Sequence, residues 1–537
     1  MPFDGSSSSS SSAASGLTEA TGTGVGDTDA SSTTESLSSD SASSGTTPDS
    51  STSAAESTTT TGVDASPPAI LGYNFSPSSL LVSGPISVEV LTEGADGVRL
   101  TFGYQLIELV SEGDGIFTGE VQIYTGADNG EHAVTITPWS GEGDDEEEGE
   151  AEETTYVVAL PPPGSELFWE AGDLIGPGIG VAVALLPSGD LVELGTRYDD
   201  GFEPRCYLRR RDPGGTWGPG DYVQVLPGVR CEATDLAIDA DGGIHVLAQR
   251  GAEGEAVWWL GSIASWGAAP ATRGLGSQDE EANALAENDG TIVICGAMPS
   301  GLGDLDVMLR TYRPQQTGIL KKLDYKPPGV IPSHTVDENA YDCVFRAPDD
   351  LVVIGDAFGQ HVDDGPKLNR RFSLRYDPVA NNNAEEPFIV HAPELGDPAQ
   401  SFARGVTIGD FDDAIIVGYS CHENCVKDEY EGRLWVELSQ GNLLDEISLG
   451  FFGIESYAPH AVAWSPAHYV VVASGGPDDD FLLGAYKPFK DEPSWQFSKK
   501  TAGKLQIARD VLIGSAGEVY GVGIGAGYYP AIAYVGG

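Results

Sequence analysis

Basic residues are scarce in this chain of 537 residues. Lys and Arg number 28 against 82 Asp and Glu, so the formal net charge is −54 at pH 7. A surface of this sign repels nucleic acid and anionic membranes, and it favours cations, basic proteins or neutral glycans as partners. Acidity also keeps a protein soluble without any partner, and this alternative stays open. No stretch of about 18 apolar residues occurs, so we expect no segment that spans a membrane.

Helical periodicity is also scarce, because few segments place their apolar residues 3.6 positions apart. Turn-forming residues are abundant instead, with 70 Gly and 34 Pro, and short apolar runs lie between them. This composition predicts an all-β protein. The length corresponds to about three or four domains.

Residues 1–66 hold few large apolar side chains. Ser and Thr occupy 34 of these 66 positions, beside nine acidic residues and no Lys or Arg. Such a stretch cannot bury enough apolar area to offset chain entropy, so we predict disorder. Its start lacks the basic and apolar regions of a signal peptide. The stretch resembles the spacer behind the acylated Cys of bacterial surface lipoproteins, which implies export and a lipid anchor not visible in this sequence. A solubilising linker without export is the alternative.

Residues 67–161 are predicted to form a separate β-sandwich. Seven short runs bounded by Gly, Asp or Pro are expected as strands: 68–75, 86–91, 97–102, 106–109, 116–124, 132–137 and 156–160. The runs Gly115-Ile-Phe-Thr-Gly-Glu-Val121 and Asn129-Gly-Glu-His-Ala-Val-Thr-Ile136 resemble the late strands of bacterial immunoglobulin-like modules, which implies an immunoglobulin-like spacer. The acidic block 141–153 is interpreted as a solvated loop, with cation binding as the alternative.

A strand–turn–strand pattern occurs seven times in residues 162–537. Its clearest copy spans 234–248, where Asp241-Gly242 supplies the turn between two β-rich runs. The seven turns lie between 48 and 63 residues apart, at Gly189, Gly242, Gly290, Asp349, Asp412, His468 and Gly517. A β pattern that repeats about every 40–50 residues is typical of propeller blades, and longer spacing indicates longer loops.

Two further strands complete each predicted unit. The third often ends in an aromatic residue and Pro, as in 372–378, and the fourth precedes the next hairpin, as in 222–226. The chain ends after the third strand of the seventh unit, whereas Glu166-Leu-Phe-Trp169 precedes the first hairpin without a unit of its own. We therefore predict a seven-bladed β-propeller over residues 162–537, closed by this N-terminal strand without an exposed seam.

Two units carry a family resemblance. Gly290-Thr-Ile-Val-Ile-Cys-Gly296, followed by Gly303-Asp-Leu-Asp-Val-Met-Leu-Arg-Thr-Tyr-Arg-Pro314, resembles the delta-60 type of bacterial propeller repeat. The run Ile238-Asp-Ala-Asp-Gly-Gly-Ile-His-Val246 is similar to the NHL repeat. The resemblance implies a propeller that binds a ligand or scaffolds an assembly, and it implies no single activity.

The first strand of each blade is expected to line a central channel. One aligned row there contains Ala182, Asp235, Asn283, Asp342, Gly405, Ala461 and Asp510, and the row before it contains Val181, Thr234, Ala282, Tyr341, Arg404, His460 and Arg509. Side chains alternate along a strand, so one row faces the channel mouth. We predict a binding site formed by Asp235, Asn283, Tyr341, Asp342, Arg404, His460, Arg509 and Asp510. A water-filled channel whose carboxylates pair with neighbouring Arg is the alternative.

One segment of the sequence resembles a turn that occurs in a class of enzymes. Residues 210–217 resemble the Asp-box turn of sialidase-like propellers, although Arg210 occupies the place of its hydroxyl residue and no second copy is clear. Neither an arginine triad with its Tyr/Glu nucleophile nor a P-loop, a Ser-His-Asp order or an HExxH motif is visible. We therefore expect a protein that is not an enzyme, with a carbohydrate-active hydrolase of sialidase-like type as the alternative.

The six Cys are even in number and lack zinc-like spacing, and six thiols allow 15 pairings. We predict one disulfide between Cys206 and Cys231, at the junction of the first two units, and another between Cys421 and Cys425 within a loop. A metal site around Cys421-His-Glu-Asn-Cys425 is the alternative, but a closed zinc site needs four ligands. Disulfides indicate an oxidising, extracytoplasmic compartment.

The remaining metal-type residues give weaker signals. Cys295 and Cys343, in neighbouring units, either pair or stay buried as thiols. The loop acids at 361–364 and 478–480 are interpreted as turn formers, because no loop has the ligand spacing of an EF-hand. Ca²⁺ binding there is the alternative, and we predict no other cofactor.

Together these features predict a non-catalytic binding or scaffolding protein, secreted or on the cell surface, that displays a propeller on a disordered stalk. We expect a monomer whose partner is a protein or a glycan, not nucleic acid, and whose membrane association depends on a lipid anchor alone. A purely structural role is the remaining hypothesis. The sequence does not identify the ligand.

Overall fold

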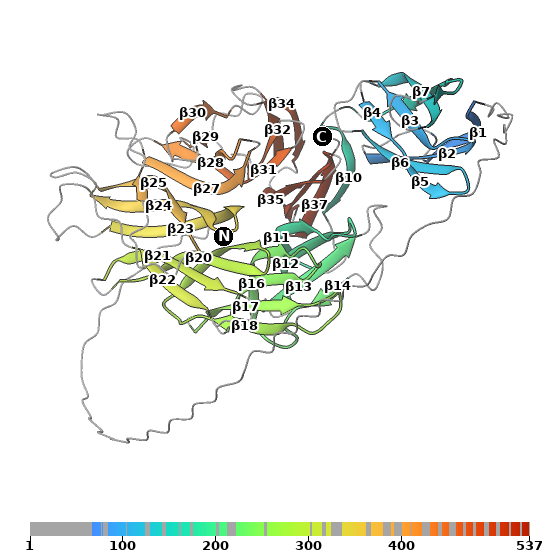
Figure 1. Cartoon of the computed structure of the whole chain (residues 1–537). Coiled ribbons are helices and arrows are strands. Elements are labelled where there is room, and N and C mark those ends of the chain that lie inside the picture. The colour runs from blue at the N-terminus through green and yellow to red at the C-terminus, as the bar shows by residue number, and fades with distance from the viewer. Residues whose placement is uncertain are drawn as a thin grey trace, which may run out of the picture. The chain divides into compact units, whose positions relative to one another are not determined.

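A computed structural model describes residues 67–535 of the chain. Its gaps are 77, 79–83, 104, 124–128, 142–146, 161, 163, 172–175, 200–202, 212–221, 252–254, 301–302, 314–317, 324–335, 361–366, 380–387, 391–399, 410, 422–429, 439–442, 450–457, 466–468, 476–479, 488–492, 501–504, 515–516 and 527–528. The described part is all-β, as predicted (Figure 1). The predicted disorder of residues 1–66 lies outside it.

Two sheets form a sandwich in the N-terminal part. One has the order β1-β2-β6-β5, made of β1 (Ala69–Ser76), β2 (Gly84–Glu93), β6 (Ile116–Ile123) and β5 (Val110–Gly113). The other has the order β4-β3-β7-β8, with β9 also on β7, made of β4 (Gln105–Glu108), β3 (Gly97–Phe102), β7 (Gly130–Ser140), β8 (Glu147–Glu148) and β9 (Glu152–Val158). Inward side chains such as Val88, Leu100 and Ile136 share one buried core. The alternation of apolar and polar residues along each strand explains this packing.

The acidic block 141–153 differs from the loop that its charge predicted. Glu147 and Glu148 pair with Ser140 and Trp139 of β7, and residues 152–153 begin β9. The like charges stay exposed while the backbone hydrogen bonds extend the sheet. The solvated-loop interpretation is therefore wrong for these residues, because backbone pairing in a sheet does not require apolar side chains when one face is open to water.

Residues 166–535 fold into seven four-stranded antiparallel sheets that follow one another around a common centre (Figure 1). Six of them use consecutive strands. These are β11 (Gly178–Leu185), β12 (Leu191–Tyr198), β13 (Pro204–Arg211), β14 (Tyr222–Gln224); β15 (Cys231–Ile238), β16 (Ile244–Arg250), β17 (Val257–Ile263), β18 (Ala271–Leu275); β19 (Glu281–Asn288), β20 (Thr291–Pro299), β21 (Leu305–Tyr312), β22 (Ile319–Leu323); β23 (Val336–Ala347), β24 (Asp350–Gln360), β25 (Lys367–Tyr376), β26 (Phe388–Val390); β27 (Gln400–Ile408), β28 (Ala414–Cys421), β29 (Glu431–Glu437), β30 (Leu443–Ser448); and β31 (Ala458–Ser465), β32 (Tyr469–Gly475), β33 (Phe481–Tyr486), β34 (Pro493–Lys499).

The seventh sheet joins the two ends of this region. It has the order β10-β37-β36-β35, with β35 (Ile507–Ile513), β36 (Val519–Gly525), β37 (Tyr529–Val535) and β10 (Glu166–Ala171). The predicted pairing of the N-terminal strand with the last strand is confirmed, for example by Trp169 opposite Ala533. The pairing covers an edge of β37 that would otherwise offer unpaired N–H and C=O groups.

Apolar cores lie between all seven pairs of neighbouring sheets, including the seventh and the first. The second strand of each sheet shows why these cores form. In β24, Leu351, Val352, Val353 and Ile354 are all buried, because both faces of the sheet meet a neighbour. Near-continuous apolar runs of this kind are typical of strands that are covered on both sides.

The first strand of each sheet forms its inner edge. Each pairs with only one strand of its own sheet. Each also contacts the first strand of the next sheet, from β11 and β15 through to β31 and β35, and β35 contacts β11. These seven strands therefore follow one another in a ring, and we call the region that they surround the centre of the ring.

Candidate functional site

A β-bulge occurs at the same place in the first strand of all seven sheets. A bulge leaves one residue without a partner across the hairpin and turns its side chain away from the regular alternation. We call these seven residues the bulge row. They are Val181, Thr234, Asn283, Tyr341, Arg404, His460 and Arg509.

At one sheet the bulge row differs from the rows that we aligned in the sequence, and the aligned position of Asn283 is wrong. Asn283 was aligned with Asp235, but it is the bulged residue of β19, and Ala284 pairs with Cys295 in the place that Asp235 has in β15. The reason is the turn. In β19–β20 the turn contains only Asp289 and Gly290, with φ of 47° and 77°. The bulged residue of β19 is therefore one position closer to the turn glycine than the bulged residue of β15. An alignment on the turn glycines consequently placed Asn283 one position too far along the strand.

Asp235 follows the bulge in β15 and links two sheets. Its Oδ1 accepts a hydrogen bond from the N–H of Leu236 at 2.7 Å, and its Oδ2 accepts one from the N–H of Leu285 in the next sheet at 2.6 Å. Charge-assisted hydrogen bonds to backbone N–H groups are among the strong ones in proteins. The carboxylate therefore fastens β15 to β19.

The same link occurs at two other sheet junctions. Asp342 accepts from Cys343 N and Val406 N, and Asp510 accepts from Val511 N and Val183 N, all at 2.8 Å. The alternative in which these carboxylates pair with Arg is wrong for all three, because their partners are backbone N–H groups. Asp510 connects the seventh sheet to the first across 327 residues of sequence.

Burial changes the acidity of these three carboxyl groups. Desolvation raises the pKa of Asp342 to about 7 and that of Asp510 to about 6, although backbone N–H donors act in the opposite direction. The pKa of Asp235 is raised well above its usual value, first by desolvation and then by the charge of Asp342. The three groups are therefore close enough around the centre of the ring to influence one another.

Arg404 has the largest set of contacts in the bulge row. Its guanidinium donates to Oδ2 of Asp356 at 2.8 Å, to the Ala403 carbonyl at 2.6 Å and to the Tyr419 hydroxyl at 3.2 Å. It also lies 4.0 Å from the ring centroid of Tyr341. The carboxylate and the aromatic rings together hold this cation in one orientation.

The partners of Arg404 escaped sequence reasoning. Desolvation raises the pKa of Asp356 to about 6, with Arg404 acting against this shift. Asp356 and Tyr419 lie on second strands, directly after Gly355 and Gly418 in otherwise apolar runs. A polar residue that interrupts a buried strand was the signal that could have identified both.

His460 and Arg509 have no hydrogen bond or ion pair to other described residues. Desolvation lowers the pKa of His460 to about 3, and the charges of Arg509 and Arg404 act in the same direction, so the imidazole is neutral at physiological pH. Desolvation also lowers the pKa of Arg509, and no acidic group counters it. The side chain of Arg509 is nevertheless exposed.

Asn283 binds the neighbouring sheet. Its Nδ2 donates to Oδ1 of Asn339 at 2.7 Å and to the Ala340 carbonyl at 2.8 Å, both in β23. The structure thus separates the eight residues of the predicted site into two groups. Four of them bridge sheets: Asp235, Asn283, Asp342 and Asp510. The others cluster through stacking or charge on the fourth to seventh sheets: Tyr341, Arg404, His460 and Arg509.

The cysteine predictions have three outcomes. Cys206 and Cys231 form the predicted disulfide, with Cα atoms 5.3 Å apart. Cys421 is disulfide-bonded, while Cys425 lies outside the described residues. Cys295 and Cys343 are buried free thiols that are hydrogen-bonded to each other.

Metal binding receives no support from the part of the chain that the structure describes. Within it, no three His, Cys, Asp or Glu side chains are grouped to hold an ion, and no helix is long and apolar enough to cross a membrane. The Asp-box residues 212–217 and the loop acids 361–364 and 478–479 are outside the described residues, so those interpretations stay predictions.

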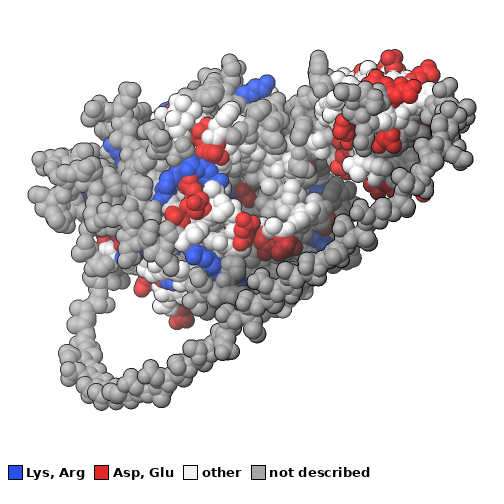
Figure 2. All heavy atoms as spheres, viewed as in Figure 1, with Lys and Arg blue, Asp and Glu red and all other residues white. Residues whose placement is uncertain are grey.

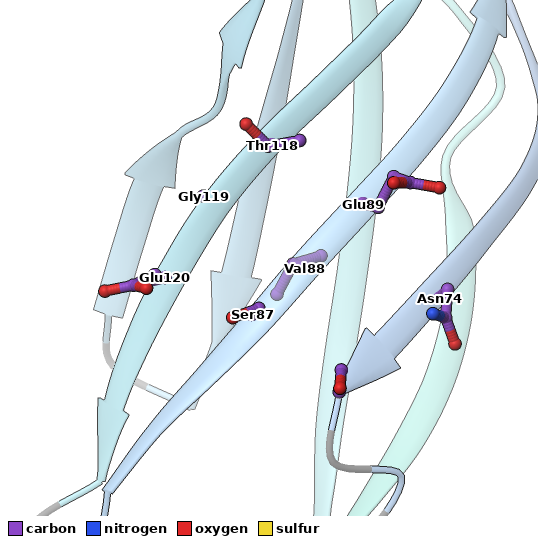
Figure 3. A pocket seen from close by; sticks show the side chains of 8 residues that line it. Asn74, Ser87, Val88, Glu89, Thr118, Gly119 and Glu120 are labelled. Carbon is purple, nitrogen blue, oxygen red and sulfur yellow. The ribbon is translucent and has the colours of Figure 1, made fainter.

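The sandwich has a shallow polar hollow on the outer face of β1, β2 and β6. Asn74, Ser87, Glu89, Thr118 and Glu120 line it. Figure 3 shows Glu89 and Glu120 apart on neighbouring strands, without convergence on one point. The hollow therefore resembles an ordinary solvated sheet face more than a binding site.

No protein-family model matches the chain, and no curated protein is similar to it. Among solved structures, a polysaccharide lyase is 11% identical with a TM-score of 0.44, covering 70% of this chain and 93% of its own. The periplasmic gluconolactonase of Pseudomonas aeruginosa is also 11% identical, with a TM-score of 0.41 and coverage of 67% and 96%. A Hadza microbial sialidase is 10% identical, with a TM-score of 0.36 and coverage of 76% and 90%.

These similarities concern architecture only, and their low identities and TM-scores carry no conclusion about activity. The all-β chain, with its four-stranded sheets arranged around a centre, fits a β-propeller.

Proposed function

We propose that this chain is a non-catalytic, extracytoplasmic binding protein whose seven sheets are the blades of a propeller closed by β10. The observation that carries this proposal is the bulge row on the inner strands. Four of its members are large polar or aromatic residues on consecutive sheets: Tyr341, Arg404, His460 and Arg509. Side chains of this kind, presented at the inner edge of a rigid sheet, suit the recognition of a protein segment or a glycan.

The rest of the chain would display this site. In our proposal the sandwich of residues 67–161 is an immunoglobulin-like spacer, and residues 1–66 are a stalk that leads to a lipid anchor. The Cys206–Cys231 disulfide supports an oxidising compartment, because disulfides seldom persist in the cytosol. The chain acts as a monomer in this proposal.

The chemistry of the carboxylates supports binding over hydrolysis. A general acid or base must exchange a proton with the substrate, within hydrogen-bond reach of it. In Asp235, Asp342 and Asp510 both oxygens already accept backbone N–H groups. Their role in this proposal is to hold the bulge row in place.

The second candidate is a carbohydrate-active hydrolase, and one observation favours it. Asp356 has its pKa raised to about 6 and lies beside the Arg404 guanidinium, which also contacts the Tyr419 hydroxyl. A carboxyl group with this acidity is suited to proton transfer near neutral pH.

One pair of assays on the full chain separates the two candidates. The chain is applied to a glycan array and, in parallel, incubated with aryl glycosides that release a coloured phenol on hydrolysis. We expect saturable array binding that weakens in the Arg404→Ala variant, without phenol release. Phenol release that disappears in Asp356→Asn would establish the hydrolase instead, and an array without any saturable signal would leave glycan binding unsupported.

A further inference from the structure

Arg509 is a cation without a described partner in an exceptionally acidic chain. Acidic residues outnumber basic ones by 82 to 28, yet Arg509 has no ion pair or hydrogen bond with any described residue. Three Arg side chains on the strands are paired: Arg404 with Asp356, Arg371 with Glu437 and Arg209 with Glu170. Figure 2 likewise shows Lys and Arg directly beside Asp and Glu near the middle of the sheets.

Arg509 is accessible to a ligand, because its side chain is exposed and has no acceptor among the described residues. A guanidinium has five N–H donors in a planar fork. Surrounding protein lowers the pKa of this one by desolvation, and no carboxylate among the described residues compensates. A ligand anion would supply the missing acceptors, and bidentate pairs of guanidinium with carboxylate or phosphate are particularly favourable.

The neighbours of Arg509 provide further donors at the same end of the inner strands. His460 occupies the equivalent bulge of the preceding sheet, and Arg404 that of the sheet before. The strands are close there, because a Cβ built on Gly405 would lie 2.9 Å from the Cα of Ala461 and 3.2 Å from the His460 carbonyl oxygen. The neutral imidazole retains one N–H that it can donate, and it has no described partner.

We propose that Arg509, with His460 and Arg404 beside it, binds the carboxylate or phosphate group of a small ligand at the centre of the ring. This inference rests on the proposed binding function and names the chemical class that the site takes. Arg509 supplies the direct contact, and His460 donates one hydrogen bond. Arg404, fixed by Asp356 and Tyr341, contributes positive charge.

The net charge of −54 limits the size of this ligand. A polyanion would meet repulsion along the whole acidic surface, whereas a single anionic group inside the ring meets mainly the local cations, because salt screens charges beyond about 8 Å at physiological ionic strength. The site therefore suits a small molecule or a chain end, and it does not suit nucleic acid.

The test is calorimetric titration of the full chain with two probes at constant ionic strength. Sodium phosphate represents the phosphate class, and sodium gluconate represents a carboxylate on a sugar-like chain. We expect at least one probe to bind saturably and Arg509→Ala to lower its association constant at least tenfold. Arg273→Ala is the matched control, since Arg273 is an exposed Arg on the outer strand β18 and its loss removes the same charge.

Each result decides the inference. Saturable binding that is lost in Arg509→Ala and kept in Arg273→Ala supports it, and the stronger probe identifies the class. Equal binding by the parent and Arg509→Ala, or equal losses in both variants, overturns it. Should Arg509→Ala fail to fold, Arg509→Gln replaces it, as a neutral side chain of similar shape. If neither probe binds while the glycan array retains its signal, the anion site is wrong and the binding function stands.

Discussion

At the scale of single residues, Asp235, Asp342 and Asp510 fasten neighbouring sheets through backbone N–H groups. Each accepts hydrogen bonds from two backbone N–H groups of buried residues, one in its own strand and one in the next sheet. These N–H groups therefore do not need water as an acceptor. Leaving such a donor without an acceptor costs about 1–3 kcal/mol. These carboxylates are thus stabilising residues first, whatever the ring binds.

The Asp342→Ala variant tests this role. It leaves the N–H groups of Cys343 and Val406 without the carboxylate, so we expect the free energy of unfolding to fall by about 1–3 kcal/mol. Urea denaturation measures the change. Asp190→Ala is the control, because the Asp190 carboxylate accepts a hydrogen bond only from the exposed hydroxyl of Ser188 among described residues. Equal stability of Asp342→Ala and the parent would show that the two sheets do not depend on this link.

At the scale of elements, β10 pairs with the last strand from the opposite end of the sequence. Its backbone pairs with β37 from Glu166 to Ala171. The Trp169 ring of this strand also packs edge-on against Phe481, with ring centroids 5.0 Å apart, and its centroid lies 6.1 Å from that of Phe497. The strand therefore contacts the sixth sheet as well as the seventh. The strand therefore combines hydrogen bonding at an edge with aromatic packing.

Trp169→Ala should weaken this closure. Loss of the indole removes its contacts with both Phe rings, and we expect a destabilisation of about 3 kcal/mol together with faster proteolytic cleavage near β10. Thermal unfolding and limited proteolysis measure the two effects. Phe411→Ala serves as the control, since Phe411 is 84% exposed in a turn. Similar cleavage rates for Trp169→Ala and Phe411→Ala would argue against a closing role for β10.

At the scale of the whole molecule, the raised pKa values of buried carboxyl groups make stability depend on pH. The pKa values of Asp342, Asp510 and Asp356 are about 7, 6 and 6 in the folded chain, above the value near 4 of an unfolded Asp. Between about pH 4 and 7 the folded state therefore binds more protons than the unfolded state. The free energy of unfolding is therefore greatest at the acidic end of this pH window and falls as pH rises.

We expect the melting temperature to decrease from pH 5 to pH 8, with a loss of unfolding free energy of about 5 kcal/mol. Calorimetry measures this in low and high salt, because about 1 M salt screens surface repulsion but not the buried carboxyl groups. The slope should persist in high salt and become smaller in Asp342→Asn. A melting temperature that rises from pH 5 to pH 8 would contradict the raised pKa values.

Local patterns made most of the architecture predictable. Turn residues such as Gly189 and Gly242 adopt the positive φ that only glycine reaches easily, so the hairpins could be recognised from the sequence. The strand at 166–169 was predictable because it had no sheet of its own. Strand β8 was missed, because its two Glu residues carry no apolar signal, and the register of β19 was shifted by its shorter turn.

The candidate site was only half predictable. Period-two alternation identified the inner strands and the Asp, Tyr, His and Arg residues on them. The sequence by itself thus determined the all-β chain and its hairpins. The tertiary structure alone decided that Asp510 bonds to Val183, that Arg404 pairs with Asp356 and that Arg509 has no partner among the described residues. Turns and alternation depend on adjacent residues, whereas hydrogen bonds and acidity at the ring depend on strands that meet only when the chain closes.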